Sequence, residues 1–212
     1  MADFKTVPSI GGRIAAIRKA RGFKSTKDLA DAVPNDSVTE SILQNIEAGR
    51  KNDLAVSQLI NIAWALKISP LFLLAPLGSP EGKLDLPNLS DEVNALTVAQ
   101  FDAWVASLGD GVYIPTRLDE RYERSELAAL RELHELRREL ERFVVMQRLT
   151  LADNSQGADS EFIIESNQTR IDVTASRIRE LERYLRPGGW DIGTTERRDD
   201  GEEKATGQAE TA

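Results

Sequence analysis

The sequence predicts an all-α protein, and three observations indicate this fold class. Aromatic residues make up 6% of the 212 residues and charged residues 29%, a composition that favours helices over a β-sandwich. Short apolar segments with helical spacing fill the first 75 residues, each bounded by a capping residue, a glycine or a proline. From residue 119 onward, two long segments repeat apolar residues at three-, four- or seven-residue intervals. We therefore expect a helical N-terminal domain (1–78), a linker with a short amphipathic helix (79–118), a long antiparallel helical hairpin (119–187) and a disordered polar tail (188–212).

The first two helices are predicted from spacing and capping residues. Ile10, Ile14 and Ile17 fall four and three positions apart and share one helix face. Gly22 ends that helix, and the segment from Ser25 to Asp28 has the pattern of a capping box that starts the next one. The second helix is short, because Pro34 ends it and residues 34–37 form a turn.

Three further helices complete the first domain. The third begins at Thr39, a natural N-cap, and runs to Gly49, with Leu43 and Ile46 pointing inward. A polar loop at residues 50–52 leads to a fourth, largely apolar helix over residues 56–66. A fifth helix, residues 70–75, follows a serine N-cap with proline at its first position. Five short helices in about 70 residues, two of them joined by a turn, are typical of one DNA-binding arrangement.

Residues 10–74, about a third of the chain, resemble the Cro/repressor-type (XRE-type) helix-turn-helix domain. The motifs that carry the resemblance are Ile10-Gly-Gly-Arg13-Ile14, Arg18-Lys-Ala-Arg21-Gly22, Leu29-Ala30, Leu43-Gln-Asn-Ile46-Glu47-Ala-Gly49-Arg50-Lys51 and Leu59-Ile-Asn-Ile-Ala63-Trp-Ala-Leu66. The chain departs from the family between Val33 and Val38, where four residues replace the usual single glycine. The resemblance implies a five-helix, lambda-repressor-like fold with residues 39–48 as the recognition helix in the major groove.

The outward residues of this helix have side chains suited to base edges. Gln44 and Asn45 each offer a donor and an acceptor, which matches adenine N6 and N7, while Glu40 could accept from cytosine N4 and Ser41 could serve any base. We expect base contacts from Thr39, Glu40, Ser41, Gln44 and Asn45. We expect phosphate contacts from Arg13, Lys24, Ser25, Thr26, Lys27, Arg50, Lys51 and Asn52. For the outward residues of the third helix, the alternative is that they are ordinary exposed polar residues. For Glu47 the resemblance implies a structural ion pair with Arg13 or Arg18.

The distribution of charge supports a nucleic-acid partner although the net charge is −8. The first 78 residues hold ten basic and seven acidic residues, a net charge of +3, which leaves −11 for the remainder. Such asymmetry between parts of a chain is typical of a nucleic-acid-binding module joined to another segment. The alternative is a solvated basic helix face.

The remainder of the chain is expected to form a docking unit and a dimer interface. A capping box at Thr97 starts a helix with Phe101 and Trp104 on one face, and Trp64 is either a docking or dimer contact or a surface tryptophan. Two long helices joined by a nine-residue loop form the hairpin, and we expect it to self-associate into a four-helix dimer. The expected dimer contacts are Leu133, Leu136, Leu140, Phe143, Ile164, Ile171, Ile178 and Leu185.

Other functional classes are disfavoured by what the sequence lacks. It has no cysteine, which excludes disulfides, thiol catalysis and cysteine-type zinc sites and suits the reducing cytoplasm. It also has no apolar run long enough to span a membrane, no signal-peptide pattern, no metal-ligand spacing, no nucleophile–base pair and no phosphate-binding glycine loop, so we expect no enzyme, metal or cofactor. The leading hypothesis is a sequence-specific DNA-binding regulator, a repressor of phage or bacterial type acting as a dimer. The alternative is a coiled-coil adaptor or antitoxin-like protein that binds a protein partner, with DNA binding secondary.

Overall fold

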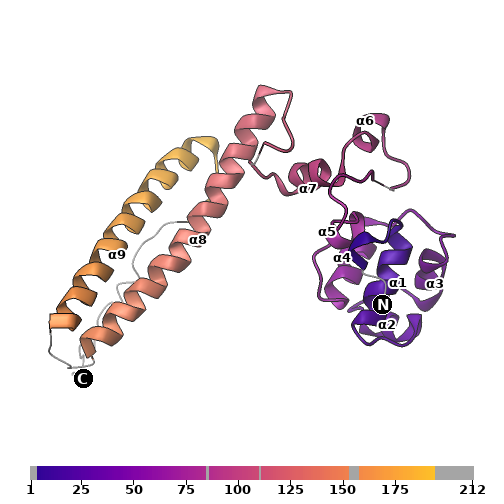
Figure 1. The fold of residues 1–212 in the computed structure, drawn as a ribbon, viewed down its shortest axis with the longest axis horizontal. Coiled ribbons are helices and arrows are strands. Elements are labelled where there is room, and N and C mark those ends of the chain that lie inside the picture. Colours follow the sequence, from indigo (N-terminus) through magenta and orange to yellow (C-terminus); the bar gives the residue numbers. More distant parts are fainter. Residues whose placement is uncertain (1–3, 85, 110, 153–157, 194–212) are drawn as a thin grey trace, which may run out of the picture. The chain divides into compact units, whose positions relative to one another are not determined.

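In the computed structural model, the described residues form helices, turns and loops, without any β-strand (Figure 1). The structure describes residues 4–84, 86–109, 111–152 and 158–193. The chain divides into two compact units, Met1–Ser125 and Glu126–Ala212. The expectation of an all-α fold is therefore confirmed for the described residues.

The N-terminal helical region consists of the short helices η1 (Phe4–Thr6), α1 (Ile10–Ala20), α2 (Thr26–Ala32), α3 (Glu40–Glu47), α4 (Val56–Ala65) and α5 (Leu71–Leu74). One apolar core joins them, and its fully buried members include Ile14 of α1, Leu29 of α2, Leu43 of α3 and Ile62 of α4. The predicted caps at Ser25 and Thr39 are present, and Ser9 caps α1 by accepting from the Gly12 N–H. Local capping and apolar spacing thus set the helix boundaries.

Helices α1 and α3 approach each other so closely that one position requires glycine. A Cβ atom on Gly11 would lie 2.0 Å from the carbonyl oxygen of Ile46. Any larger residue would push the two helices apart, because backbone atoms cannot yield as the end of a flexible side chain can. Gly11 therefore fixes the distance between α1 and the helix that carries the candidate base contacts.

The segment predicted as a linker shares a small apolar core with the end of α5. It contains α6 (Asp91–Asn94) and α7 (Val98–Ala106), and the predicted capping box at Thr97 is present. Leu84, Val98 and Phe101 are buried together with Ala75, which directly follows α5. The same compact unit contains α1–α5, and the short amphipathic helix expected in this linker is α7.

The C-terminal unit is built on an antiparallel pair of long helices, α8 (Leu118–Ala152), whose first residues up to Ser125 belong to the first unit, and α9 (Ala158–Leu185) (Figure 1). With 35 residues, α8 is about 52 Å long at 1.5 Å per residue. Their shared seam is stabilised by two ion pairs between the helices, Arg137–Glu182 and Arg177–Glu132, each with an N–O distance of 2.7 Å. None of the helices among the described residues is long and apolar enough to cross a membrane.

The expected dimer interface is largely the internal seam of this hairpin. Leu133, Ile178 and Leu185 are buried within one chain, which contradicts their predicted role as dimer contacts. Leu136 and Leu140 pack against the same core. The physical reason is that two antiparallel helices cover each other's apolar stripes, so that these side chains are not available to a second copy. Phe143, Ile164 and Ile171 are half-buried, and their part in a dimer stays a prediction.

The first residues of the predicted disordered tail pack onto the hairpin. After the 3-10 helix η2 (Arg186–Gly188), the Trp190 Nε1–H donates to Glu126 Oε2 at 3.0 Å, and Ile192 is buried against the seam. Arg137 donates to the Ile192 carbonyl at 2.6 Å. Residues up to Gly193 are therefore part of the folded unit, and residues 194–212 lie outside the described residues.

Candidate nucleic-acid interface

Two buried apolar side chains and one ion pair fix helix α3 to the rest of the N-terminal helical region. Leu43 and Ile46 are buried in the core. At the end of the helix, the Arg18 guanidinium of α1 donates to both carboxylate oxygens of Glu47, at 2.7 and 2.9 Å, and also to the Phe23 carbonyl. The bond to Glu47 raises the pKa of Arg18. The ion pair implied by the family resemblance is thus confirmed with Arg18, and it fixes α3 against α1 from the side opposite the exposed residues.

The exposed side of α3 carries the polar residues predicted to contact bases. Ser41 and Gln44 are exposed, and Glu40 and Asn45 are half-exposed. Gln44 Nε2 donates to Glu40 Oε1 at 3.1 Å, and Asn45 Oδ1 accepts from Arg50 Nε at 2.9 Å. These are surface hydrogen bonds, which cost little to exchange for bonds to another molecule. Thr39 is exposed as well, and its hydroxyl oxygen caps the helix by accepting from the Ile42 N–H at 3.3 Å.

Two basic residues directly follow α3 in a loop of defined geometry. Gly49 has φ +70°, a left-handed conformation that glycine adopts without strain, and it turns the chain away from the helix. The backbone N–H groups of Arg50 and Lys51 then both donate to the Asn45 carbonyl, at 2.9 and 3.0 Å. The charged ends of these side chains are therefore carried on a fixed backbone at the C-terminal end of α3.

The long turn between α2 and α3 is fastened to α4 by residues that sequence reasoning missed. Gln58 Nε2 donates to the Ser37 carbonyl at 3.1 Å, and Gln58 Oε1 accepts from Lys51 Nζ at 2.9 Å. Asn61 Nδ2 donates to the Ser37 hydroxyl at 3.1 Å and to Asn35 Oδ1 at 3.3 Å. The sequence signal that could have identified these contacts is the presence of polar residues, Gln58 and Asn61, in a largely apolar helix. Through these bonds the four residues between Val33 and Val38 form an ordered turn that fixes the start of α3.

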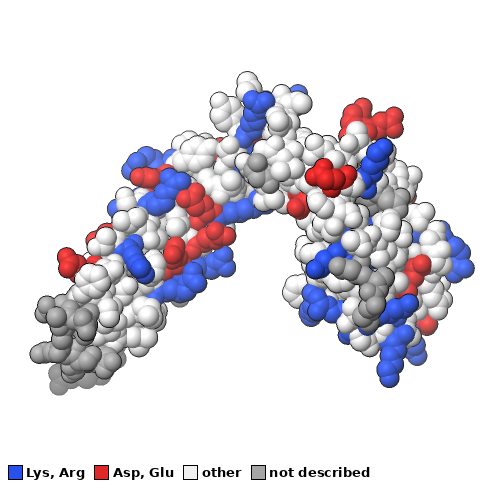
Figure 2. Space-filling view, in the orientation of Figure 1, with Lys and Arg blue, Asp and Glu red and all other residues white. Residues whose placement is uncertain are grey.

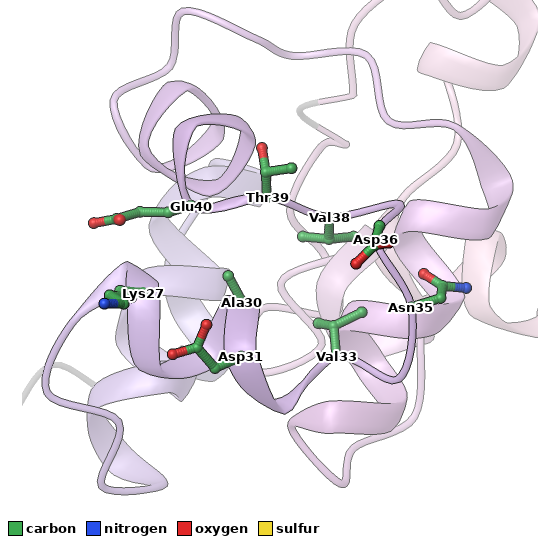
Figure 3. A pocket seen from close by; sticks show the side chains of 9 residues that line it. All are labelled: Lys27, Ala30, Asp31, Val33, Asn35, Asp36, Val38, Thr39 and Glu40. Carbon is green, nitrogen blue, oxygen red and sulfur yellow. The ribbon is translucent and has the colours of Figure 1, made fainter.

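An open cleft of about 460 Å³ lies between α2, the turn and the start of α3 (Figure 3). Its apolar wall comes from Ala30, Val33 and Val38. Among its lining residues, three are acidic and one is basic; the charged residues are Asp31, Asp36, Glu40 and Lys27. This net negative charge disfavours a phosphate inside the cleft, so phosphate contacts would have to come from basic side chains around it.

The exposed basic residues of this region are candidates for those contacts. Lys24, Lys27 and Arg50 are exposed and Lys51 is half-exposed. Figure 2 shows Lys and Arg side chains along the visible surface of the N-terminal helical region. Ser25 forms a capping box with Asp28, because its hydroxyl accepts from the Asp28 N–H while its own N–H donates to the Asp28 carboxylate. Thr26 is half-exposed beside it, and Asn52 is exposed in the loop after α3.

The predicted phosphate contact by Arg13 is wrong. Its side chain is buried and donates to the Leu73 carbonyl at 3.0 Å, the Leu74 carbonyl at 2.9 Å and the Val7 carbonyl at 2.9 Å, as well as to the Pro8 carbonyl. A guanidinium in this position supplies hydrogen-bond donors to carbonyl groups at the C-terminal end of α5, where the helix itself has none to offer, and its positive charge is favourable at that end of the helix. Arg13 is therefore a structural residue that joins α1 to α5, and it cannot reach a phosphate.

No cluster of His, Asp and Glu able to hold a metal ion was found among the described residues. Comparisons with protein-family models, with curated proteins and with solved structures gave no match to this chain.

Proposed function

We propose that this protein is a sequence-specific regulator of transcription that binds double-stranded DNA through α3, with a second copy of the chain on an adjacent half-site. The observation that carries the proposal is the two-sided character of α3. One side is fixed by Leu43, Ile46 and the Glu47–Arg18 pair, while Ser41, Gln44 and Asn45 lie outward. A helix that presents adaptable hydrogen-bonding groups from a rigid base is suited to the edges of base pairs in the major groove.

The resemblance of residues 10–74 to the XRE-type domain supports the same proposal and implies a lambda-repressor-like fold for this part. In the proposed complex, Lys24, Lys27, Arg50 and Lys51 contact phosphates on either side of α3 and set its register. No catalytic step, metal or cofactor is part of the proposal, and the proposed site of action is the cytoplasm.

The test is selection of duplexes from a random pool, followed by substitution of single adenines with 7-deaza-adenine, which lacks the N7 acceptor. If Gln44 or Asn45 binds an adenine through N6 and N7, one such substitution should cost wild type about 1–3 kcal/mol. The same substitution should cost the Gln44→Ala or Asn45→Ala variant nothing further, because the contact is already lost. Gln168→Ala, an exposed glutamine change on α9, is the matched control and should behave as wild type.

Selection that yields no preferred sequence would contradict the proposal. So would equal losses in wild type and in both α3 variants, since the adenine would then be recognised by other residues.

One observation favours a second candidate function, an adaptor or antitoxin-like role with a protein partner. Within the hairpin, large apolar side chains are exposed on either side of the connection between α8 and α9; they are Val145, Met146, Leu149, Leu151, Phe162 and Ile163. Exposed apolar groups in such number are typical of protein interaction surfaces. Under this candidate, replacing Val145 and Leu149 with serine would abolish binding of the protein partner, while the preference for selected DNA sequences would stay intact.

A further inference from the structure

Helix α4 carries an uncovered apolar stripe that the core does not use. Val56, Ile60 and Trp64 lie four positions apart and therefore share one face of the helix. They are 77%, 47% and 66% exposed, whereas Ile62, Ala63 and Leu66 bury the inner face of the same segment.

The character of the helix indicates an uncharged partner surface. None of the ten residues of α4 is charged, although 29% of the chain is. A nucleic acid or a strongly charged peptide would find no complementary charge on this face. An apolar surface of the same kind fits it.

The stripe is also self-complementary about its central residue. If two copies of α4 pack antiparallel with their Ile60 residues together, Val56 of each copy meets Trp64 of the other, since both lie four positions from Ile60. A small side chain then lies against a large one at both ends of the contact, as a two-fold interface requires.

One acidic and one basic residue flank the helix. Asp53 lies three residues before α4 and Lys67 two residues after it, and both are exposed; Asp53 Oδ2 also accepts from Asn88 Nδ2 at 2.8 Å. An antiparallel arrangement centred on Ile60 brings the Asp53 end of one copy to the Lys67 end of the other, twice in the pair. Lys67 Nζ lies 4.6 Å from the centre of the Trp64 ring, which places its charge beside the stripe.

The geometry points to an antiparallel contact between two copies of this chain, made by Val56, Ile60 and Trp64 of α4 and flanked by Asp53–Lys67 pairs. The three exposed fractions correspond to roughly 400 Å² per copy at about 200 Å² for a whole large side chain, half of the ~800 Å² that a stable interface buries on each partner. The contact is consequently weak between free chains and becomes effective when adjacent half-sites on DNA hold two copies together. That last step rests on the proposed function, whereas the contact itself does not.

Cysteine cross-linking tests the contact without DNA, because the chain has no cysteine of its own. Under mild oxidation at high protein concentration, Ile60→Cys should form a disulfide-linked dimer at least about tenfold faster than Ala32→Cys, an exposed control on α2. Equal rates for the two variants would overturn the inference.

Charge exchange tests the antiparallel register in the Ile60→Cys background. Asp53→Lys or Lys67→Asp alone should slow cross-linking by about two- to fivefold for each pair changed, and the double exchange should restore the rate. If the double exchange is slower than either single change, the register is wrong.

Binding to selected duplexes separates failure of this inference from failure of the proposed function. Trp64→Ala should bind a single half-site like wild type and lose about tenfold on two adjacent half-sites. Equal loss on both duplexes, or no loss on either, overturns the inference while leaving DNA binding intact. Absence of DNA binding together with efficient Ile60→Cys cross-linking would contradict the proposed function and support the contact.

Discussion

The N-terminal helical region and the hairpin are both helical, but they are held together in different ways. In the first, short helices surround a continuous core, and two arginines are buried, Arg13 on carbonyl groups and Arg18 on Glu47. In the second, two long helices share a single seam, and the Arg177–Glu132 pair that crosses it remains about half exposed. A region that fixes its surface residues by buried polar contacts suits recognition of a specific ligand, whereas a single-seam hairpin leaves much of its apolar surface uncovered.

The largest expected effect comes from removing the buried arginine of the N-terminal region. Arg13→Ala would leave several carbonyl groups without a donor and open a cavity between α1 and α5, and should lower the free energy of unfolding by about 3–5 kcal/mol. Urea denaturation followed by circular dichroism measures this. Arg21→Ala, an exposed change at the end of α1, should cost less than about 0.5 kcal/mol, and equal losses in both variants would contradict the distinction.

The next effect tests the seam of the hairpin. Leu133 is fully buried between α8 and α9, so Leu133→Ala should cost about 2–4 kcal/mol in the stability of the hairpin. Leu149→Ala on the same helix, at a residue 61% exposed, should be nearly neutral. Thermal melts of the two variants provide the comparison. If Leu149→Ala were the more damaging change, the seam would lie on a different face.

A smaller effect concerns the salt dependence of DNA binding. Each phosphate contact adds about 0.9 to the slope of log affinity against log salt concentration. The double change Arg50→Ala/Lys51→Ala should therefore reduce the slope by about 1.8, while Arg138→Ala/Arg142→Ala on α8 should leave it unchanged. Fluorescence anisotropy at several salt concentrations gives the slopes, and equal slopes for both double variants would exclude the loop after α3 from the interface.

The smallest effect is a pH dependence in the N-terminal region. Hydrogen bonds from the Ser25 backbone and hydroxyl hold the pKa of Asp28 below its ordinary value of 3.8. Because the folded-state pKa is lowered, this stabilisation is complete above the ordinary pKa and is lost as the pH falls through the lowered one. Asp28→Asn should thus lose less stability than wild type between pH 5 and roughly pH 2. Urea midpoints across that range test it. If the midpoints of wild type and Asp28→Asn fall equally as the pH is lowered, Asp28 makes no contribution.

The features predictable from sequence were those that depend on a few neighbouring residues. The caps at Ser25, Thr39 and Thr97 were predicted because a capping side chain bonds to a backbone group three residues away. The paired long helices followed from the repeat of apolar residues, and the Arg18–Glu47 pair followed from the family resemblance.

The features that could not be predicted depend on which distant segments meet. Nothing around Arg13 in the sequence indicates that the carbonyl groups of Leu73 and Leu74 lie beside it. Likewise, Trp190 stands in a polar stretch, and only the folded hairpin brings Glu126 within 3.0 Å of its indole nitrogen. The apolar stripes of the hairpin were identified, but spacing alone does not distinguish a seam within one chain from a seam between two.

Recognition of base sequence by α3 can be measured as a ratio of affinities. The ratio compares a selected duplex with a scrambled duplex of the same length, at low and at raised salt concentration, for wild type and for Gln44→Ala/Asn45→Ala. We expect a wild-type ratio of at least about 10³ that survives the added salt and falls by about 10- to 100-fold in the double variant. A wild-type ratio near one, or a ratio unchanged in the double variant, would show that α3 does not recognise base sequence.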